Sequence, residues 1–94
     1  MTDSNINAYL DNKGIRHDTI GRAYLMRAIR YCLDNPDCYS MMIIYDTIGD
    51  TMFASASGVE RCIRHAIQCT GAEVNNKEFI FKAADDLRYK SDRP

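Results

Sequence analysis

The sequence predicts an all-α fold of about five helices joined by short turns, with a helix-turn-helix among them. Three observations lead to this prediction. Apolar residues recur in several segments at the three- and four-residue spacing of a helix face. Residues that commonly cap helices stand at the borders of these segments. No segment bounded by glycine shows the clean two-residue alternation of a strand.

Length and composition predict one globular domain spanning residues 1–94. With 46% hydrophobic and 27% charged residues, the chain can bury a core without disulfides or metals. The start of the chain has no basic segment followed by an apolar run, and no run of 18 apolar residues occurs. We therefore expect a cytosolic protein with no membrane contact and with four reduced cysteines. The cysteine spacing fits no zinc motif, so neither a metal nor a cofactor is expected.

Charge is distributed unevenly, although the net charge is only -1. Residues 16–30 carry four arginines against a single aspartate, whereas residues 31–56 carry four aspartates and no basic residue. A net negative charge argues against nucleic-acid binding, because affinity for DNA comes largely from phosphate neutralisation. Because the arginines are concentrated in one segment, the sequence is still compatible with nucleic-acid binding.

The first two helices are predicted at about residues 3–13 and 20–33. Gly14 follows the first helix, at the position where a positive φ is often needed. The second helix ends before Pro36, because a residue that precedes proline avoids the helical region. Its arginines are expected mostly away from its apolar face, which consists of Leu25, Ala28, Ile29 and Cys32.

Two further helices are predicted at about residues 44–52 and 75–89. In isolation the apolar run 42–45 could also be a buried strand, since short apolar runs do not distinguish the two. Helical segments on both sides favour a helix. Asn75, followed three residues later by Glu78, is a variant of the capping box and opens the last helix.

The segment from Ser57 to Gln68 (SGVERCIRHAIQ) is predicted to be an amphipathic helix. Ser57 and Glu60 have the spacing of a capping box. A short helix at 44–52, a tight connection at 53–56 and this longer helix follow the order of a helix-turn-helix. Val59, Cys62, Ile63 and Ala66 form its apolar side, and the opposite side carries Ser57, Arg61, Arg64, His65 and Gln68.

The polar side of this helix predicts contacts with DNA. Arg61 and Arg64 can each present a guanidinium to guanine O6 and N7 or to a phosphate, and His65 can hydrogen-bond to either group. Glu60 can accept a hydrogen bond from cytosine N4 if it is released from capping. The same pattern also fits an ordinary surface helix whose arginines are solvated.

These residues resemble the C-terminal DNA-binding effector domain of the stage zero sporulation protein A family, a sporulation response regulator. The segment VERCIRHAIQ at 59–68 is the most specific part of the match. The resemblance implies an all-helical domain that binds a short DNA box in the major groove, often as head-to-tail copies on tandem boxes. It also implies that Glu60, Arg61, Arg64 and His65 face DNA. Further matching positions are Gly14, Ile15, Gly21, Tyr24, Leu25, Ala28, Ile29, Tyr45, Ile48, Glu78, Phe79, Ile80, Ala84, Asp85, Leu87 and Arg88.

The sequence departs from the family pattern at several places. Gly58 stands where the family usually has arginine, and Asp46 and Asp50 make the preceding helix acidic where relatives tend to be neutral or basic. The connection between Gln68 and Asn75 is shorter than in the regulator. A chain of 94 residues has no room for a phosphoacceptor receiver domain, so we expect no control by aspartyl phosphorylation within it.

The function predicted from the sequence is sequence-specific binding of double-stranded DNA through a recognition helix from Ser57 to about Cys69, with a role in transcription regulation. Arg16 and Arg22 are the candidates for phosphate contacts. The predicted DNA-binding residues are Ser57, Glu60, Arg61, Arg64, His65 and Gln68.

Two other classes of function compete with DNA binding. A protein-interaction module that keeps the fold and binds a protein partner instead of DNA would account for the net charge of -1, for Gly58 and for the aspartates. An enzyme is not expected, because His17 and His65 lack a nucleophile or carboxylate at a motif spacing.

Overall fold

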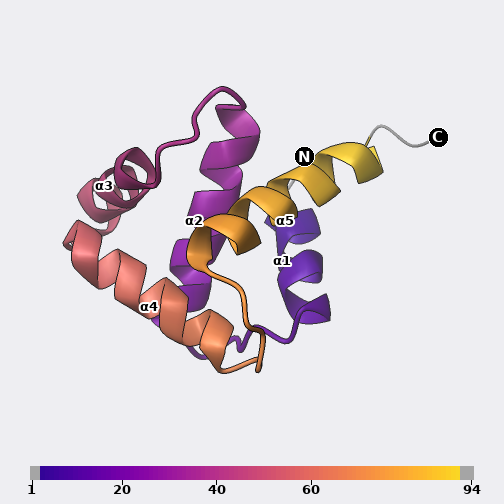
Figure 1. The fold of residues 1–94 in the computed structure, drawn as a ribbon, viewed down its shortest axis with the longest axis horizontal. Helices are drawn as coiled ribbons and strands as arrows, with labels where there is room; N and C mark the ends of the chain where they lie inside the picture. Colours follow the sequence, from indigo (N-terminus) through magenta and orange to yellow (C-terminus); the bar gives the residue numbers. More distant parts are fainter. Residues whose placement is uncertain (1–2, 92–94) are drawn as a thin grey trace.

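A computed structural model describes residues 3–91 of the chain. The described residues form five helices and no strand, which confirms the predicted all-α fold. In Figure 1, α2 lies at the centre, with α1 and α5 on one side of it and α3 and α4 on the other. The helices are α1 (Asp3–Asn12), α2 (Ile20–Asp34), α3 (Met41–Met52), α4 (Ala56–Gln68) and α5 (Asn76–Ser91).

Helix α2 is the centre of the hydrophobic core and contacts each of the other four helices. The side chains of Leu25, Ala28 and Ile29 are completely buried, and Cys32 is almost so. These are the residues of the predicted apolar face, which is therefore confirmed. Burial of a large aliphatic side chain stabilises a fold by about 1.5 to 3 kcal/mol. The apolar face of α2 therefore stabilises the packing of the other helices against it.

The boundaries of α3 differ from the prediction. The helix begins at Met41 rather than at about residue 44, because the Ser40 hydroxyl caps it by accepting a hydrogen bond from the amide of Ile43 at 3.3 Å. The run 42–45 is therefore helical, and the strand alternative is wrong. At the last helix, the Asn75 side chain accepts a hydrogen bond from the Glu78 amide at 2.8 Å, as its sequence position predicts.

A three-residue connection, 53–55, joins α3 to α4 and completes the helix-turn-helix order. Phe53 adopts the left-handed conformation at φ 57°, and Gly49 in α3 lets the connection pass close by. A Cβ atom added to Gly49 would lie 2.3 Å from the carbonyl oxygen of Ala54. The absence of a side chain at Gly49 thus allows the tight turn.

The start of α4 corrects the predicted capping box. Ser55, not Ser57, is the N-cap, and its hydroxyl accepts a hydrogen bond from the amide of Gly58 at 3.0 Å. Ser57 lies in the first turn and is exposed, and its hydroxyl is 3.4 Å from that of Ser55. The N-cap lies two residues earlier than predicted, and Ser55 has the extended backbone that an N-cap requires.

Helices α2 and α4 approach each other closely at Gly21. A Cβ atom added there would lie 2.3 Å from the carbonyl oxygen of Cys62 and 2.8 Å from the Cβ of Ala66. The absence of a side chain at Gly21 therefore permits the short distance between the first turn of α2 and the middle of α4.

Within residues 3–91, no helix combines the length and the apolar character that a membrane span requires.

Candidate nucleic-acid interface

The outer side of α4 carries the predicted polar residues. Ser57, Arg61, Arg64, His65 and Gln68 are all exposed. On the inner side, Val59 and Ile63 are fully buried, and Ala66 and Ile67 are nearly so. The strong segregation of polar and apolar residues holds the helix in one orientation on the core, so that its arginines point to solvent.

The two arginines on this surface differ in their partners. Arg64 lies 3.6 Å from the carboxylate of Glu60, one turn earlier, and both side chains are substantially exposed. Exposed pairs of this kind contribute only a few tenths of a kcal/mol, so Arg64 can readily exchange Glu60 for another acceptor. Arg61 has no ion-pair partner among the described residues. Both guanidinium groups can therefore reach an external ligand.

His65 and Cys69 lie together at the end of α4. The Sγ atom of Cys69 is 3.5 Å from Nε2 of His65, and the Cys69 amide donates to the His65 carbonyl oxygen at 3.0 Å. Cys69 is the C-cap, so the helix ends where the sequence predicted.

All four cysteines are free thiols, and within the described range no group of three or more metal-ligating side chains occurs.

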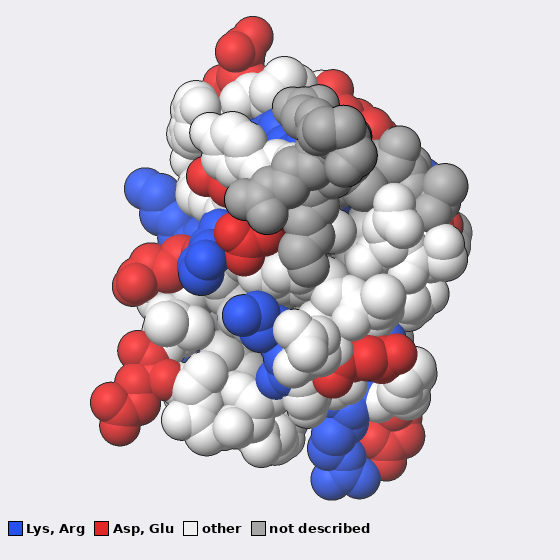
Figure 2. Space-filling model, turned by 90° about the vertical axis from the view of Figure 1, so that its right-hand side faces the viewer, with Lys and Arg blue, Asp and Glu red and all other residues white. Residues whose placement is uncertain are grey.

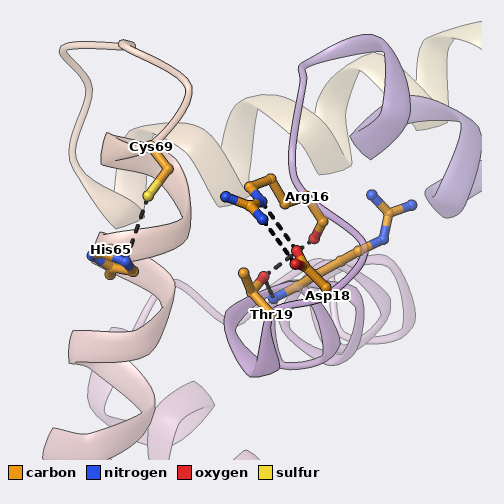
Figure 3. Close-up of polar contacts among 6 residues, drawn as sticks. Arg16, Asp18, Thr19, His65 and Cys69 are labelled. Carbon is orange, nitrogen blue, oxygen red and sulfur yellow. Dashed lines mark hydrogen bonds and ion pairs between the residues drawn. The ribbon is translucent and has the colours of Figure 1, made fainter.

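Arg16, a predicted phosphate contact, lies before α2 and is exposed. Its guanidinium donates two hydrogen bonds to Asp18, at 3.0 and 2.8 Å. This contact raises the pKa of Arg16 and lowers that of Asp18. Figure 3 shows the pair on the side of α2 that faces His65 and Cys69. Asp18 offsets much of the charge of Arg16, so a phosphate would have to compete with the carboxylate for the guanidinium.

Arg22, the second predicted phosphate contact, is not at the surface, and that prediction is wrong. Only 4% of the residue is exposed, although it was expected to point away from the core. Its guanidinium donates to the carbonyl oxygen of Ile15 at 2.7 Å, contacts both oxygens of Asn7 and pairs with Asp11 at 2.9 Å. Spacing along the helix alone cannot reveal these acceptors, which belong to the preceding segments.

The outer side of α3 is both acidic and apolar. Asp46 and Asp50 are exposed and have no ion-pair partner among the described residues. Met42 and Ile43 are 64% and 50% exposed, and Phe53 at the end of the helix is 97% exposed. A positive φ is uncommon for a residue as bulky as phenylalanine.

Asn76 is a buried polar residue that the sequence did not single out. Its side-chain amide donates to Oη of Tyr45 and to the carbonyl oxygen of Glu60, both at 3.0 Å. These bonds join the start of α5 to α3 and α4. Burial of the Tyr45 phenol raises its pKa. Asn76 therefore holds the two helices of the helix-turn-helix in a fixed relation. Its partners are distant in sequence, so no local pattern could have identified it.

The surface on the α1 and α5 side of the molecule carries charges of both signs, unlike the acidic outer side of α3. Figure 2 shows that basic and acidic side chains are interspersed on this face. Several of the described charges form ion pairs, such as Arg88 with Asp85 at 3.1 Å and Lys82 with Asp86 at 3.2 Å. Interspersed charges of this kind do not build a continuous basic surface for a phosphate backbone.

Comparison with protein families matches residues 6–94 to the family described as "Sporulation initiation factor Spo0A C terminal". The chain belongs to this family. The match covers α2 to α5 completely and α1 from Ile6 onward, which confirms the resemblance predicted from the sequence. The Spo0A C-terminal family is a family of DNA-binding regulatory domains rather than of enzymes, so DNA binding and transcription regulation are its general functions. A comparison with curated proteins gave no match.

Proposed function

We propose that this member of the Spo0A C-terminal family binds double-stranded DNA sequence-specifically, with α4 as the recognition helix in the major groove, and thereby regulates transcription. The observation that carries the proposal is the outer side of α4. It presents two arginines, a histidine and a glutamine along one exposed side of the second helix of a helix-turn-helix. A helix of this kind is the element that reads base edges in helix-turn-helix proteins.

Each residue of this surface has a chemical role in the proposal. Arg61 and Arg64 donate paired hydrogen bonds to guanine O6 and N7, the commonest base-specific contact. His65 and Gln68 hydrogen-bond to bases or phosphates nearby, and Ser57 reaches a phosphate at the start of the helix. Glu60 accepts from cytosine N4 once Arg64 has turned to the DNA.

Selection from a random duplex library, followed by fluorescence anisotropy, tests the proposal. We expect one enriched sequence that binds more tightly than its scrambled version. Arg61→Ala and Arg64→Ala should each weaken binding by about 1 to 3 kcal/mol and relax the preference at one base position. Lys82→Ala removes one positive charge from α5, where Lys82 pairs with Asp86, and serves as the charge-matched control.

Two outcomes of this experiment would contradict the proposal. Failure to enrich any sequence would exclude specific recognition, and an equal loss on all sequences in both arginine variants would show that α4 reads no base. Duplexes carrying one or two copies of the selected site test the further prediction that copies of the domain bind tandem sites head to tail. Two protein molecules should bind the double site in one orientation.

A second candidate function is favoured by the outer side of α3. Its exposed Met42, Ile43 and Phe53 lie beside two aspartates that have no ion-pair partner within residues 3–91, and such a surface suits a protein interface better than a phosphate backbone. In this alternative the domain keeps the fold and binds a protein partner in place of DNA. Stoichiometric capture of one partner by the wild-type domain, lost in Phe53→Asp and kept in Arg61→Ala, together with no enriched DNA sequence, would support it.

A further inference from the structure

A cleft of about 290 Å³ lies beside the outer side of α4. It runs between the start of α2 and the middle of α4, where Gly21 brings the two helices together. Figure 3 shows the neighbourhood of the cleft, with Thr19 on one side and His65 on the other. The lining residues are Thr19, Ile20, Gly21, Arg61, Cys62 and His65.

The lining of this cleft combines an apolar wall with a basic edge. Ile20 is 52% exposed at the first position of α2, Gly21 adds no side chain, and Cys62 is half-buried. Arg61 and His65 are exposed, and none of the described residues that line the cleft is acidic. An exposed isoleucine next to a free guanidinium is suited to a ligand that has an apolar group beside hydrogen-bond acceptors.

We propose that this cleft receives the 5-methyl group of a thymine that lies beside the base contacted by Arg61. The inference rests on the proposed function, because it requires α4 to lie in the major groove. Thymine is the base that displays an apolar methyl group there. Ile20 and Cys62 form the contact, so a residue outside the recognition helix helps to determine which sequence is bound.

Replacement of thymine by uracil in the selected duplex tests this inference, because uracil lacks only the methyl group. Each thymine of the site is replaced in turn, and affinities are measured by anisotropy. Wild-type protein should bind about fourfold more weakly when one particular thymine is replaced, which corresponds to one buried methyl group. Ile20→Ala should lose most of this preference for thymine over uracil, because only Cys62 remains to contact the methyl group, and it should still distinguish the site from its scrambled version.

Ile43→Ala is the matched control, because Ile43 is also an isoleucine near the start of a helix and is 50% exposed, against 52% for Ile20. This variant should keep the fourfold preference for thymine. Circular dichroism should show both variants folded, as expected for half-exposed side chains. The inference is overturned if the wild type distinguishes no thymine from uracil, if the selected site has no thymine, or if Ile20→Ala keeps the preference. Binding without methyl dependence would overturn only this inference, whereas failure to enrich any sequence would overturn the proposed function as well.

Discussion

The guanidinium of Arg22 joins the end of α1 to the start of α2. It donates hydrogen bonds to backbone or side-chain oxygens of Ile15 and Asn7, and it pairs with Asp11. A buried charge is tolerated only where acceptors and an opposite charge surround it, and all of these are present. Arg22 is thus a structural residue, in contrast to the exposed Arg61 and Arg64 of α4.

Arg22→Ala should destabilise the domain by about 3 kcal/mol, because it leaves buried acceptors without donors and removes one of the two partners of Asp11, which also pairs with His17. Urea denaturation followed by circular dichroism measures the loss. Arg27→Ala, at an exposed position of the same helix, is the control and should change the free energy of unfolding by less than about 0.5 kcal/mol. Equal stability of the two variants would show that the Arg22 contacts contribute nothing.

Tyr9 and Asp86 form a second contact between distant residues, in which the phenol donates to the carboxylate at 2.9 Å. Burial raises the pKa of Asp86, but hydrogen bonds from Tyr9 and Lys82 outweigh it, so the pKa is lowered overall. A lowered carboxyl pKa stabilises the fold at pH values above about 4, and this contribution is lost as the pH falls further.

Tyr9→Phe should therefore destabilise the domain by about 1 kcal/mol at pH 7 and by less at pH 3, where Asp86 takes up a proton more readily. Urea denaturation at the two pH values measures both effects. Tyr89→Phe is the control, because Tyr89 is an exposed residue of α5. If Tyr9→Phe lost as much stability at pH 3 as at pH 7, the hydrogen bond to the ionised Asp86 carboxylate would not be the source of the effect.

At the scale of elements, the helix-turn-helix depends on how α3 ends and how α4 begins. Phe53 ends α3 in the left-handed conformation, and Ser55 caps α4 two residues later. Gly49 lets the connection pass against α3, and Asn76 ties both helices to the start of α5. The orientation of the outer side of α4 is therefore determined by contacts at the ends of helices.

Ser55→Ala should destabilise the domain by about 1 kcal/mol, because the amide of Gly58 loses its acceptor. Ser57→Ala should leave the thermal midpoint almost unchanged, since Ser57 is exposed in the first turn and caps nothing. Differential scanning calorimetry compares the two variants directly. A larger loss of stability in Ser57→Ala than in Ser55→Ala would show that Ser57 is the N-cap of α4, as the sequence predicted.

At the scale of the whole molecule, charge is arranged by face. The face on the α1 and α5 side has interspersed charges (Figure 2), the outer side of α3 is acidic, and the outer side of α4 carries two available arginines. Arg22 is buried and Arg16 is held by Asp18, so the arginines of residues 16–30 contribute less to DNA binding than the sequence suggested.

This arrangement predicts a weak dependence of DNA binding on salt. With two or three cationic side chains bound to the DNA, Arg61 and Arg64 among them, the logarithm of the binding constant should fall with the logarithm of salt concentration with a slope of about -2 to -3. Anisotropy titrations at several salt concentrations measure the slope. Asp18→Asn, which frees Arg16, should make the slope steeper, and Asp86→Asn on α5 should not. A slope much steeper than -3 in the wild type would show that more cations reach the DNA than this surface provides.

Much of the architecture could be predicted from the sequence alone. The apolar faces of α2 and α4, the glycine after α1, the Asn75 cap and the end of α2 before Pro36 all depend on residues within a few positions of each other. The outer side of α4 follows from the same local periodicity, and its residues are exposed as expected. Local hydrogen bonds and helix geometry are sufficient for predictions of this kind.

Only the tertiary structure decided which polar residues are available to a ligand. Arg22 is buried because oxygens from α1 and from the following loop surround it, and Arg16 is paired because Asp18 lies within its reach. Asn76 joins three helices, and the cleft at Ile20 lies where α2 and α4 meet beside Gly21. Packing sets the environment of these side chains, and it depends on residues that are far apart in the sequence.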